Sequence, residues 1–227
     1  MARLFFIAVA LAMLSACDKD EKVNRDFSFN FKDGTEGWQS FFSDYPVGTE
    51  AAFELQFEHS NLPAPLDNSI PALKISGNNH SDDLLSFIYR KFDGLQPNKI
   101  YTVTFDVQMA SNAPTNSIGI GGSPDLAFGV GGTATEPANT PDSDNWYRPN
   151  FTSQLQSSES NNTLQMAGTI GVGEDDTNFT IISRDNKNTP LRLTTNSNGE
   201  VWLMMGTDSG FEGTTTLYYT SIKIKLD

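Results

Sequence analysis

The sequence predicts an all-β protein folded as an antiparallel β-sandwich, and three observations support this fold class. From Phe27 onward, apolar residues alternate with polar ones or form short runs, as in strands. These runs are separated by Gly, Pro, Asn and Asp, which favour turns. The chain also contains 16 Phe, 6 Tyr and 3 Trp, enough aromatic surface to fill a layer between two sheets.

The expected strands follow one another along the whole chain. They are, in order, residues 27–31, 53–57, 73–75, 84–92, 101–107, 164–170, 179–182, 191–195, 201–205 and 215–225. Segment 84–92 also fits a helical period, which is the alternative for that element. Asn198-Gly199 predicts a type I′ hairpin turn between 191–195 and 201–205. Segment 109–162 is interrupted by many Gly and Pro residues, so we expect long loops there, and such loops often carry function.

Length, charge and cysteine content limit the class of protein. The chain has 227 residues, with Lys+Arg 15 against Asp+Glu 28 and a net charge of -13. This length suits one domain with short appendages. Binding to nucleic acid requires a basic face, and the acidic composition argues against such a partner. A single Cys excludes a disulfide within the chain.

The first residues have the layout of a secretory signal. Arg3 supplies a positive charge, and residues 4–14 form an apolar run too short to span a bilayer as a helix. The sequence Leu14-Ser15-Ala16-Cys17 resembles the lipobox of bacterial lipoproteins. The resemblance implies that residues 1–16 are removed and that Cys17 carries a diacylglyceryl thioether and an acylated amino group (palmitate), which attach it to a lipid bilayer. An ordinary secreted protein is the alternative.

The residues after Cys17 are expected to form a tether. Residues 17–26 make up the lipidated N-terminus and tether, and residues 27–227 form a single β-sandwich domain. The acidic cluster at 18–22 resembles a surface-export signal of Bacteroidetes lipoproteins, whereas an Asp directly after the Cys resembles an inner-membrane retention signal of enteric bacteria. We expect an outer-membrane lipoprotein at the cell surface, with a periplasm-facing protein as the alternative.

Three segments carry a resemblance to jelly-roll carbohydrate-binding modules, namely Lys91–Val107, Phe31–Trp38 and Thr214–Ile224. The resemblance implies a jelly-roll-type antiparallel β-sandwich, a non-catalytic role, a glycan ligand and a structural calcium ion. Thr220 stands where these modules commonly have an Asp, which weakens the expectation of calcium. Two further segments, 78–83 and 206–213, look like motifs of uncharacterised surface lipoproteins, and they imply no activity.

Aromatic residues in predicted loops are the best candidates for sugar binding. Sugars stack their apolar faces on aromatic rings, while neighbouring polar side chains bind the hydroxyls. The candidate ligand-binding residues are Trp146 and Tyr147 for stacking, Asp144, Asn145 and Arg148 for orientation, and Phe42 and Tyr45 near another turn. The alternative for Trp146 is a loop anchor folded onto the sandwich, and Trp38 and Trp202 are expected in the core.

Metal-binding and catalytic alternatives have weaker support in the sequence. His59 and His80, with Glu58, Asp82 and Asp83, could supply zinc ligands, and loops 142–145 and 174–176 carry oxygen ligands suited to calcium. Solvated polar loops, in which the acids and Asn residues stabilise turns through local hydrogen bonds, are the simpler explanation of both sets. We expect no enzyme, because no catalytic motif is present. A polysaccharide lyase or glycoside hydrolase remains the less favoured alternative, and a structural or adhesion lipoprotein docking on another envelope protein is the main one.

Overall fold

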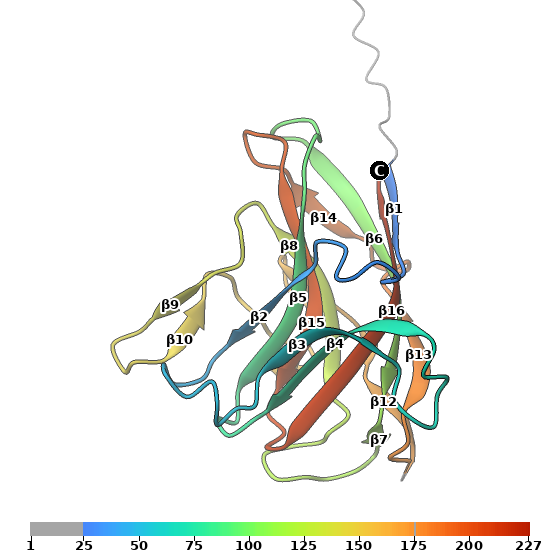
Figure 1. Ribbon diagram of the computed structural model, residues 1–227. Coiled ribbons are helices and arrows are strands. Elements are labelled where there is room, and N and C mark those ends of the chain that lie inside the picture. The colour runs from blue at the N-terminus through green and yellow to red at the C-terminus, as the bar shows by residue number, and fades with distance from the viewer. Residues whose placement is uncertain (1–24, 175) are drawn as a thin grey trace, which may run out of the picture.

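The computed structural model describes residues 25–174 and 176–227, and within them most of the strands form two large antiparallel sheets packed face to face (Figure 1). The predicted signal peptide, Cys17 and the predicted tether up to residue 24 lie outside the described residues. The larger sheet has seven strands, and these are β13 (Thr180–Asp185), β6 (Ile100–Ser111), β16 (Thr214–Leu226), β4 (Pro71–Asn78) and β3 (Gln56–Asn61) in order, with β1 (Arg25–Phe29) beside β16 and β14 (Leu191–Thr194) beside β6.

The second sheet has five strands in the described part of the chain. Their order is β11 (Leu164–Thr169), β8 (Ala127–Thr133), β15 (Val201–Ser209), β5 (Leu84–Phe92) and β2 (Gln39–Ser43). A hairpin of β9 (Asn139–Pro141) and β10 (Tyr147–Pro149) projects from this framework (Figure 1). A parallel pair, β7 (Ala113–Thr115) with β12 (Gly171–Glu174), and a 3₁₀ turn, η1 (Leu155–Ser157), complete the elements. The predicted jelly-roll-type antiparallel β-sandwich is confirmed.

The main hydrophobic core lies between the two sheets. It includes Trp38 at 1% exposure and fully buried Phe105 and Leu203. A second cluster contains Trp202, Met204 and Leu155. Because Leu203 and its neighbours alternate between the two clusters along β15, the second cluster covers the outer face of the five-stranded sheet, under η1. Both Trp38 and Trp202 therefore belong to the core, as predicted.

Several strands match the expected segments, and one does not. Segment 84–92 is β5, so the strand prediction is confirmed over its helical alternative. Residues 51–54 form a turn instead of the strand expected at 53–57, and β3 begins only at Gln56. In that turn Glu54 has a φ of 49°, and Phe53 is 3% exposed and packs against Tyr45. The apolar alternation at 53–57 therefore comes partly from a turn whose Phe53 side chain is buried, and not from a continuous strand.

The Asn198-Gly199 turn connects the sheets and does not close a hairpin. Gly199 has a φ of 71°, but Asn198 is not among the described residues with a positive φ, so the turn is not of type I′. The N–H of Gly199 donates to the carbonyl of Asn196, which closes a turn over residues 196–199. The flanking strands, however, pair elsewhere: β14 pairs with β6, and β15 pairs with β5 and β8. The predicted hairpin and its type I′ turn are therefore wrong, although the chain does turn at these residues. In a β-sandwich the chain often crosses from one sheet to the other between consecutive strands. The local sequence around Asn198-Gly199 does not distinguish such a crossing from a hairpin.

The two ends of the sandwich differ in what they carry. Arg25 pairs with Leu226 and donates to the carbonyl of Gly94 at 2.6 Å, so the described chain begins beside the C-terminus at one end (Figure 1). At the opposite end Leu84 pairs with Ser209. Within the described residues, no helix is long and apolar enough to cross a membrane. The candidate site lies at the Leu84 end.

Candidate functional site

The β9–β10 hairpin is held against the chain that follows β2. The N–H of Asp44 donates to the carbonyl of Tyr147 at 3.0 Å, and the N–H of Tyr147 donates to the carbonyl of Tyr45 at 3.0 Å. The N–H of Val47 donates to the carbonyl of Asn145 at 2.9 Å, which extends the pairing. The hairpin therefore has backbone partners on both sides of β10, and its tip is positioned by the sandwich.

Asp142 organises the tip of this hairpin. Its Oδ1 atom accepts hydrogen bonds from the N–H of Asp144 at 2.9 Å and of Trp146 at 3.0 Å. Its Oδ2 atom accepts from Nε of Arg148 at 2.9 Å. The Trp146 N–H, followed by the Arg148 guanidinium, lowers the pKa of Asp142, so this carboxylate stays charged. Asp142 thus fixes the backbone at Trp146 and the side chain of Arg148 together.

Arg148 also reaches two carboxylates from other elements. Its Nη1 atom lies 2.7 Å from Oδ1 of Asp44 and 3.9 Å from Oδ2 of Asp83. The Asp44 side chain is only 10% exposed, whereas that of Arg148 is 44% exposed. Burial raises the pKa of Asp44, and Arg148 opposes this shift. The guanidinium therefore neutralises a buried acid on one side and faces solvent on the other.

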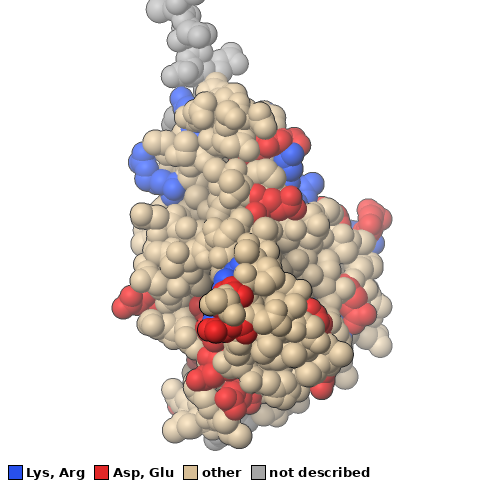
Figure 2. Space-filling model, turned by 90° about the vertical axis from the view of Figure 1, so that its left-hand side faces the viewer, with Lys and Arg blue, Asp and Glu red and all other residues tan. Residues whose placement is uncertain are grey.

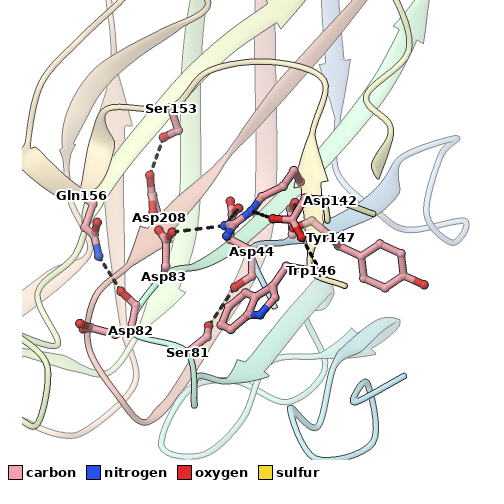
Figure 3. A network of polar contacts seen from close by, with 12 residues as sticks. Asp44, Ser81, Asp82, Asp83, Asp142, Trp146, Tyr147, Ser153, Gln156 and Asp208 are labelled. Carbon is pink, nitrogen blue, oxygen red and sulfur yellow. Dashed lines mark hydrogen bonds and ion pairs between the residues drawn. The ribbon is translucent and has the colours of Figure 1, made fainter. Parts of the chain in front are cut away.

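Trp146 and Tyr147 lie on opposite sides of the hairpin strand, as consecutive residues of an extended chain do (Figure 3). The Trp146 indole is partly exposed, and the Arg148 guanidinium lies over it at 5.3 Å. The Tyr147 ring points away from the carboxylates and packs on Tyr45 at 5.2 Å between centroids. The structure thus brings Trp146 and Arg148 together, and the expectation that Trp146 and Tyr147 face one ligand together is corrected.

Phe42 and Tyr45 are packed into the protein. Tyr45 is 5% exposed, and burial raises its pKa to about 12. Phe42, on β2, is half-buried and packs on two hydrophobic clusters. Tyr45 therefore serves in packing, and Phe42 packs with it, so a ligand contact by either residue stays a prediction. Asp144 and Asn145, in contrast, are exposed at the hairpin tip, where Asn145 adopts a φ of 63°.

Asp83, whose Oδ2 atom lies 3.9 Å from Nη1 of Arg148, forms a pair of carboxyl groups with Asp208 (Figure 3). Asp83, just before β5, is within hydrogen-bonding reach of Asp208 near the end of β15. Asp208 is 6% exposed, and its Oδ2 atom accepts from Oγ of Ser153 at 2.6 Å. Burial, followed by the negative charges of Asp44 and Asp208, raises the pKa of Asp83 to about 7. Two carboxyl groups at hydrogen-bonding distance favour sharing one proton.

The acidic character of this region extends over the surrounding surface. Figure 2 shows the face that carries the hairpin, where acidic side chains gather around basic ones near the centre and continue below them. Among the carboxylates on the hairpin side of the protein, Asp44, Asp83 and Asp142 lie within 4 Å of Arg148. A ligand at this face therefore meets more carboxylates than cations.

The sequence-predicted metal residues have other roles in the described chain. Nε2 of His59 lies 2.6 Å from the carbonyl of Phe31, and His80 stacks edge-on against Phe53 at 5.6 Å. Glu174 accepts from Nδ2 of Asn116 at 3.0 Å. Over residues 25–174 and 176–227, no group of three or more His, Cys, Asp or Glu side chains is placed to hold a metal ion.

Two functional candidates were missed by sequence reasoning, namely Asp44 and Ser153. Asp44 follows β2 and lies among aromatic residues, so its sequence gives no sign of an ion pair with a residue 104 positions away. Asp83 and Asp208, however, belong to the two segments resembling motifs of lipoproteins. The structure joins these segments, because Nδ2 of Asn79 donates to the carbonyl of Ser209 at 2.6 Å.

Comparison with known proteins gives only distant structural similarities. No protein-family model matches the chain, and no curated protein matches it. The CBM22-1 xylan-binding domain of Paenibacillus barcinonensis Xyn10C is 12% identical, with a TM-score of 0.40 over 88% of this chain and 92% of that domain. The K1 cleaved adhesin domain of Lys-gingipain from Porphyromonas gingivalis is 10% identical, with a TM-score of 0.38 over 88% and 97%.

A third similar structure comes from work on carbohydrate-binding modules of the β-sandwich superfamily. It is 14% identical, with a TM-score of 0.42, and the match covers 85% of this chain and 58% of that one. These values are too low to transfer a ligand, so the function is inferred below from the chain's own residues.

Proposed function

We propose that this protein is a non-catalytic surface lipoprotein whose β-sandwich binds glycans at the β9–β10 hairpin. The observation that carries the proposal is the Trp146 indole, partly exposed and placed beside Arg148 by Asp142. An aromatic face next to charged hydrogen-bonding groups suits a sugar ring, which has an apolar face and a rim of hydroxyls. Asp144 and Asn145, exposed at the hairpin tip, would bind hydroxyls.

The anchor in this proposal is acylated Cys17, and the bilayer is the outer membrane. Lasting attachment needs more than one acyl chain. A diacylglyceryl thioether together with an acylated amino group would provide it. Arg25 begins the described chain at the end of the sandwich opposite Leu84 and Ser209. The candidate site would therefore face away from the membrane that holds Cys17. Incorporation of labelled palmitate, lost in Cys17→Ser, tests the anchor, and protease treatment of intact cells tests surface exposure.

The glycan-binding proposal is tested on an array of glycans with the full chain, purified in a sugar-free detergent. We expect saturable binding to one class of glycan, lost in Trp146→Ala and kept in Ile100→Ala. Ile100 is 51% exposed and lies at the start of β6, so it is a matched control for loss of a large exposed side chain. Running the array with calcium and with a chelator tests the structural calcium ion expected from the sequence.

A second candidate function is docking on another protein of the envelope. The observation that favours it is the loop between β7 and β8, in which Ile118 is 96% exposed and Ile120 is 73% exposed. Absence of binding to every glycan on the array would favour this second function over glycan binding. Crosslinking on intact cells, lost in the double variant Ile118→Ser and Ile120→Ser, would then identify the partner.

A further inference from the structure

The outer face of the seven-stranded sheet carries basic side chains at the end where the described chain begins. Arg192 of β14 and Lys223 and Lys225 of β16 are exposed there, and buried residues alternate with them along both strands. Ile100, the first residue of β6, is 51% exposed at the same end. These four residues are called the tether-end face below.

Sheet pairing places the four side chains together. Thr102 of β6 pairs with Arg192, and Thr104 pairs with Lys225. Residues opposite each other in a sheet project from the same face, as do residues two apart along one strand. Ile100 therefore shares the outer face with the cations, and an apolar side chain lies among positive charges.

A hollow lies in the sheet beside Lys223 and Lys225. It has a volume of about 370 Å³, and residues of β1, β6 and β16 form its walls together with Lys187. Asp26 and Asp106 also line it, and Nζ of Lys187 lies 2.7 Å from Oδ2 of Asp106. The lining thus has more cations than carboxylates, although the whole chain has a net charge of -13.

Two of the cations are available to an outside partner. Over residues 25–174 and 176–227, neither Arg192 nor Lys223 has an ion pair or a side-chain hydrogen bond, whereas Nζ of Lys225 lies 2.7 Å from Oδ2 of Asp227. The charges of unpaired, exposed cations act on the solvent side without compensation. They attract anions that approach this face.

The opposite end of the sandwich has the opposite character. There Arg148 is surrounded by Asp44, Asp83 and Asp142. In Figure 2 the basic side chains lie in the upper and middle parts of the viewed face, and only acidic side chains colour its lowest part. An extended anionic surface would therefore attract the tether-end face and repel the end that carries the candidate site.

The tether-end face also lies close to the proposed anchor. Arg25 pairs with Leu226, directly after Lys225, and Cys17 stands eight positions before Arg25 in the sequence. Eight residues span at most about 29 Å, so a chain held at Cys17 keeps this end of the sandwich near the bilayer. Anionic headgroups attract Lys and Arg side chains that come within about 8 Å, the Debye length at physiological salt.

We propose that the tether-end face rests on the membrane that holds Cys17 and binds the phosphate groups of anionic lipid headgroups. Lys223 and Lys225 would meet phosphates at the hollow, Arg192 would meet them beside it, and Ile100 would enter the interface. Cations around an exposed apolar side chain suit such a surface, because apolar burial and attraction to anionic lipids both contribute to binding. The inference rests on the lipid anchor of the proposed function and is independent of the glycan ligand.

The experiment measures how close each end of the sandwich lies to a bilayer. The full chain, processed and acylated in a bacterial host, is reconstituted in vesicles of phosphatidylcholine, alone or mixed with phosphatidylglycerol. Cys17 is the single Cys, so an introduced Cys is the only free thiol after acylation. A fluorophore is attached to Ser197→Cys, in the exposed turn before β15, or to Ser143→Cys, exposed at the hairpin tip, and energy transfer to a headgroup-labelled lipid is recorded.

We expect phosphatidylglycerol to raise energy transfer from position 197 and not from position 143, and high salt to remove the rise. The double variant Arg192→Gln with Lys223→Gln should lose the rise. Lys32→Glu, exposed on the turn after β1, changes the net charge equally and should keep it. Ile100→Ser should reduce the rise, whereas Ile118→Ser, which removes an exposed Ile at the opposite end, should leave it unchanged.

The outcomes separate this inference from the anchor. If the protein sediments with both kinds of vesicle but phosphatidylglycerol does not change the energy transfer from position 197, the inference is overturned and the anchor stands. A rise that persists in the double variant also overturns it, because the named cations are then not the ones that bind. Failure of the acylated protein to sediment with either kind of vesicle overturns the anchor and this inference together, and leaves glycan binding in place.

Discussion

Nη1 of Arg148 lies 2.7 Å from Oδ1 of Asp44, and this contact joins the projecting hairpin to the sandwich across 104 positions of sequence. Because Asp142 holds Nε of the same guanidinium, Arg148 is fixed at two points. Its remaining surface faces Trp146 and solvent. The position of Trp146 and Arg148 in the candidate site therefore depends on one cation that is shared by Asp44 and Asp142, carboxylates from two different loops.

Replacing Arg148 by Met should destabilise the protein. The substitution keeps much of the apolar stem but leaves Asp44, with a side chain 10% exposed, without its cation. We expect a loss of about 2 kcal/mol in the free energy of unfolding at pH 7, reduced from the value for a fully buried pair because Arg148 is partly solvated. The loss should shrink in acid, where Asp44 becomes neutral. Urea unfolding at several pH values measures both effects.

Lys187→Met is the matched control for that measurement. Nζ of Lys187 lies 2.7 Å from Oδ2 of Asp106, but the side chains are 56% and 39% exposed. An exposed pair of this kind contributes about 0–1 kcal/mol. Equal losses for the two variants would contradict the structural role of Arg148.

Asp83 should make the stability of the protein depend on pH. Its pKa is raised from 3.8 to about 7 in the folded state, by burial and then by Asp44 and Asp208. Between these values the folded state binds more protons than the unfolded state, so stability falls as the pH rises from about 4 to about 7. Asp83→Asn should remove that fall, and the variant should melt above the wild type at pH 8 but not at pH 4.

Asp82→Asn provides the comparison for Asp83→Asn. Asp82 is the exposed neighbour, and its φ of 59° is well tolerated by Asn. Differential scanning calorimetry from pH 4 to pH 8 should give parallel curves for Asp82→Asn and the wild type. A wild-type melting temperature that does not fall across this interval would contradict the raised pKa.

The sequence predicts the strands that alternate or are long, and it misses strands defined by tertiary contact. β5 and β16 are recognisable because their apolar residues face a core. β8 lies in the segment expected to be irregular, because it reads AFGVGGT. Glycine is normally unfavourable in a strand. In β8, however, Gly129 leaves room for Leu155 of η1, and Gly131 leaves room for the backbone of Thr163 just before β11. That requirement is visible only once the partners are in place.

Gly131 provides a test of this explanation. A Cβ atom at Gly131 would lie 2.0 Å from the carbonyl oxygen of Thr163, a backbone atom that cannot move independently. Gly131→Ala should therefore cost about 2–3 kcal/mol in the free energy of unfolding. At Gly122 the nearest atoms lie at 3.6 Å, so Gly122→Ala should be nearly neutral. Urea unfolding of both variants measures the difference, and equal costs would show that β8 tolerates side chains.

The candidate site was predictable only in its local part. The sequence 144–148 places an aromatic residue beside polar ones, and the structure keeps Trp146 and Arg148 together. The carboxylates that complete the site come from three distant segments, and their proximity follows from sheet pairing. Alternation also separates Trp146 from Tyr147, which becomes evident only once Trp146 and Tyr147 are seen to pair as extended residues.

Asp142 should control how well Trp146 is positioned. Asp142→Ala removes the acceptor for the N–H groups of Asp144 and Trp146 and one contact of Arg148, whereas Asp142→Asn keeps an oxygen at the backbone donors. We expect Asp142→Ala to cost about 1–2 kcal/mol in the free energy of unfolding. Asp142→Asn should cost less, because its amide oxygen still accepts from the two backbone donors, although these hydrogen bonds are weaker without the charge. Trp38 and Trp202 are buried at 1% and 9% exposure, so collisional quenching by acrylamide reports mainly on Trp146. Quenching should rise in Asp142→Ala and remain near the wild-type value in Asp142→Asn; identical quenching in all three proteins would show that the hairpin tip holds its indole without Asp142.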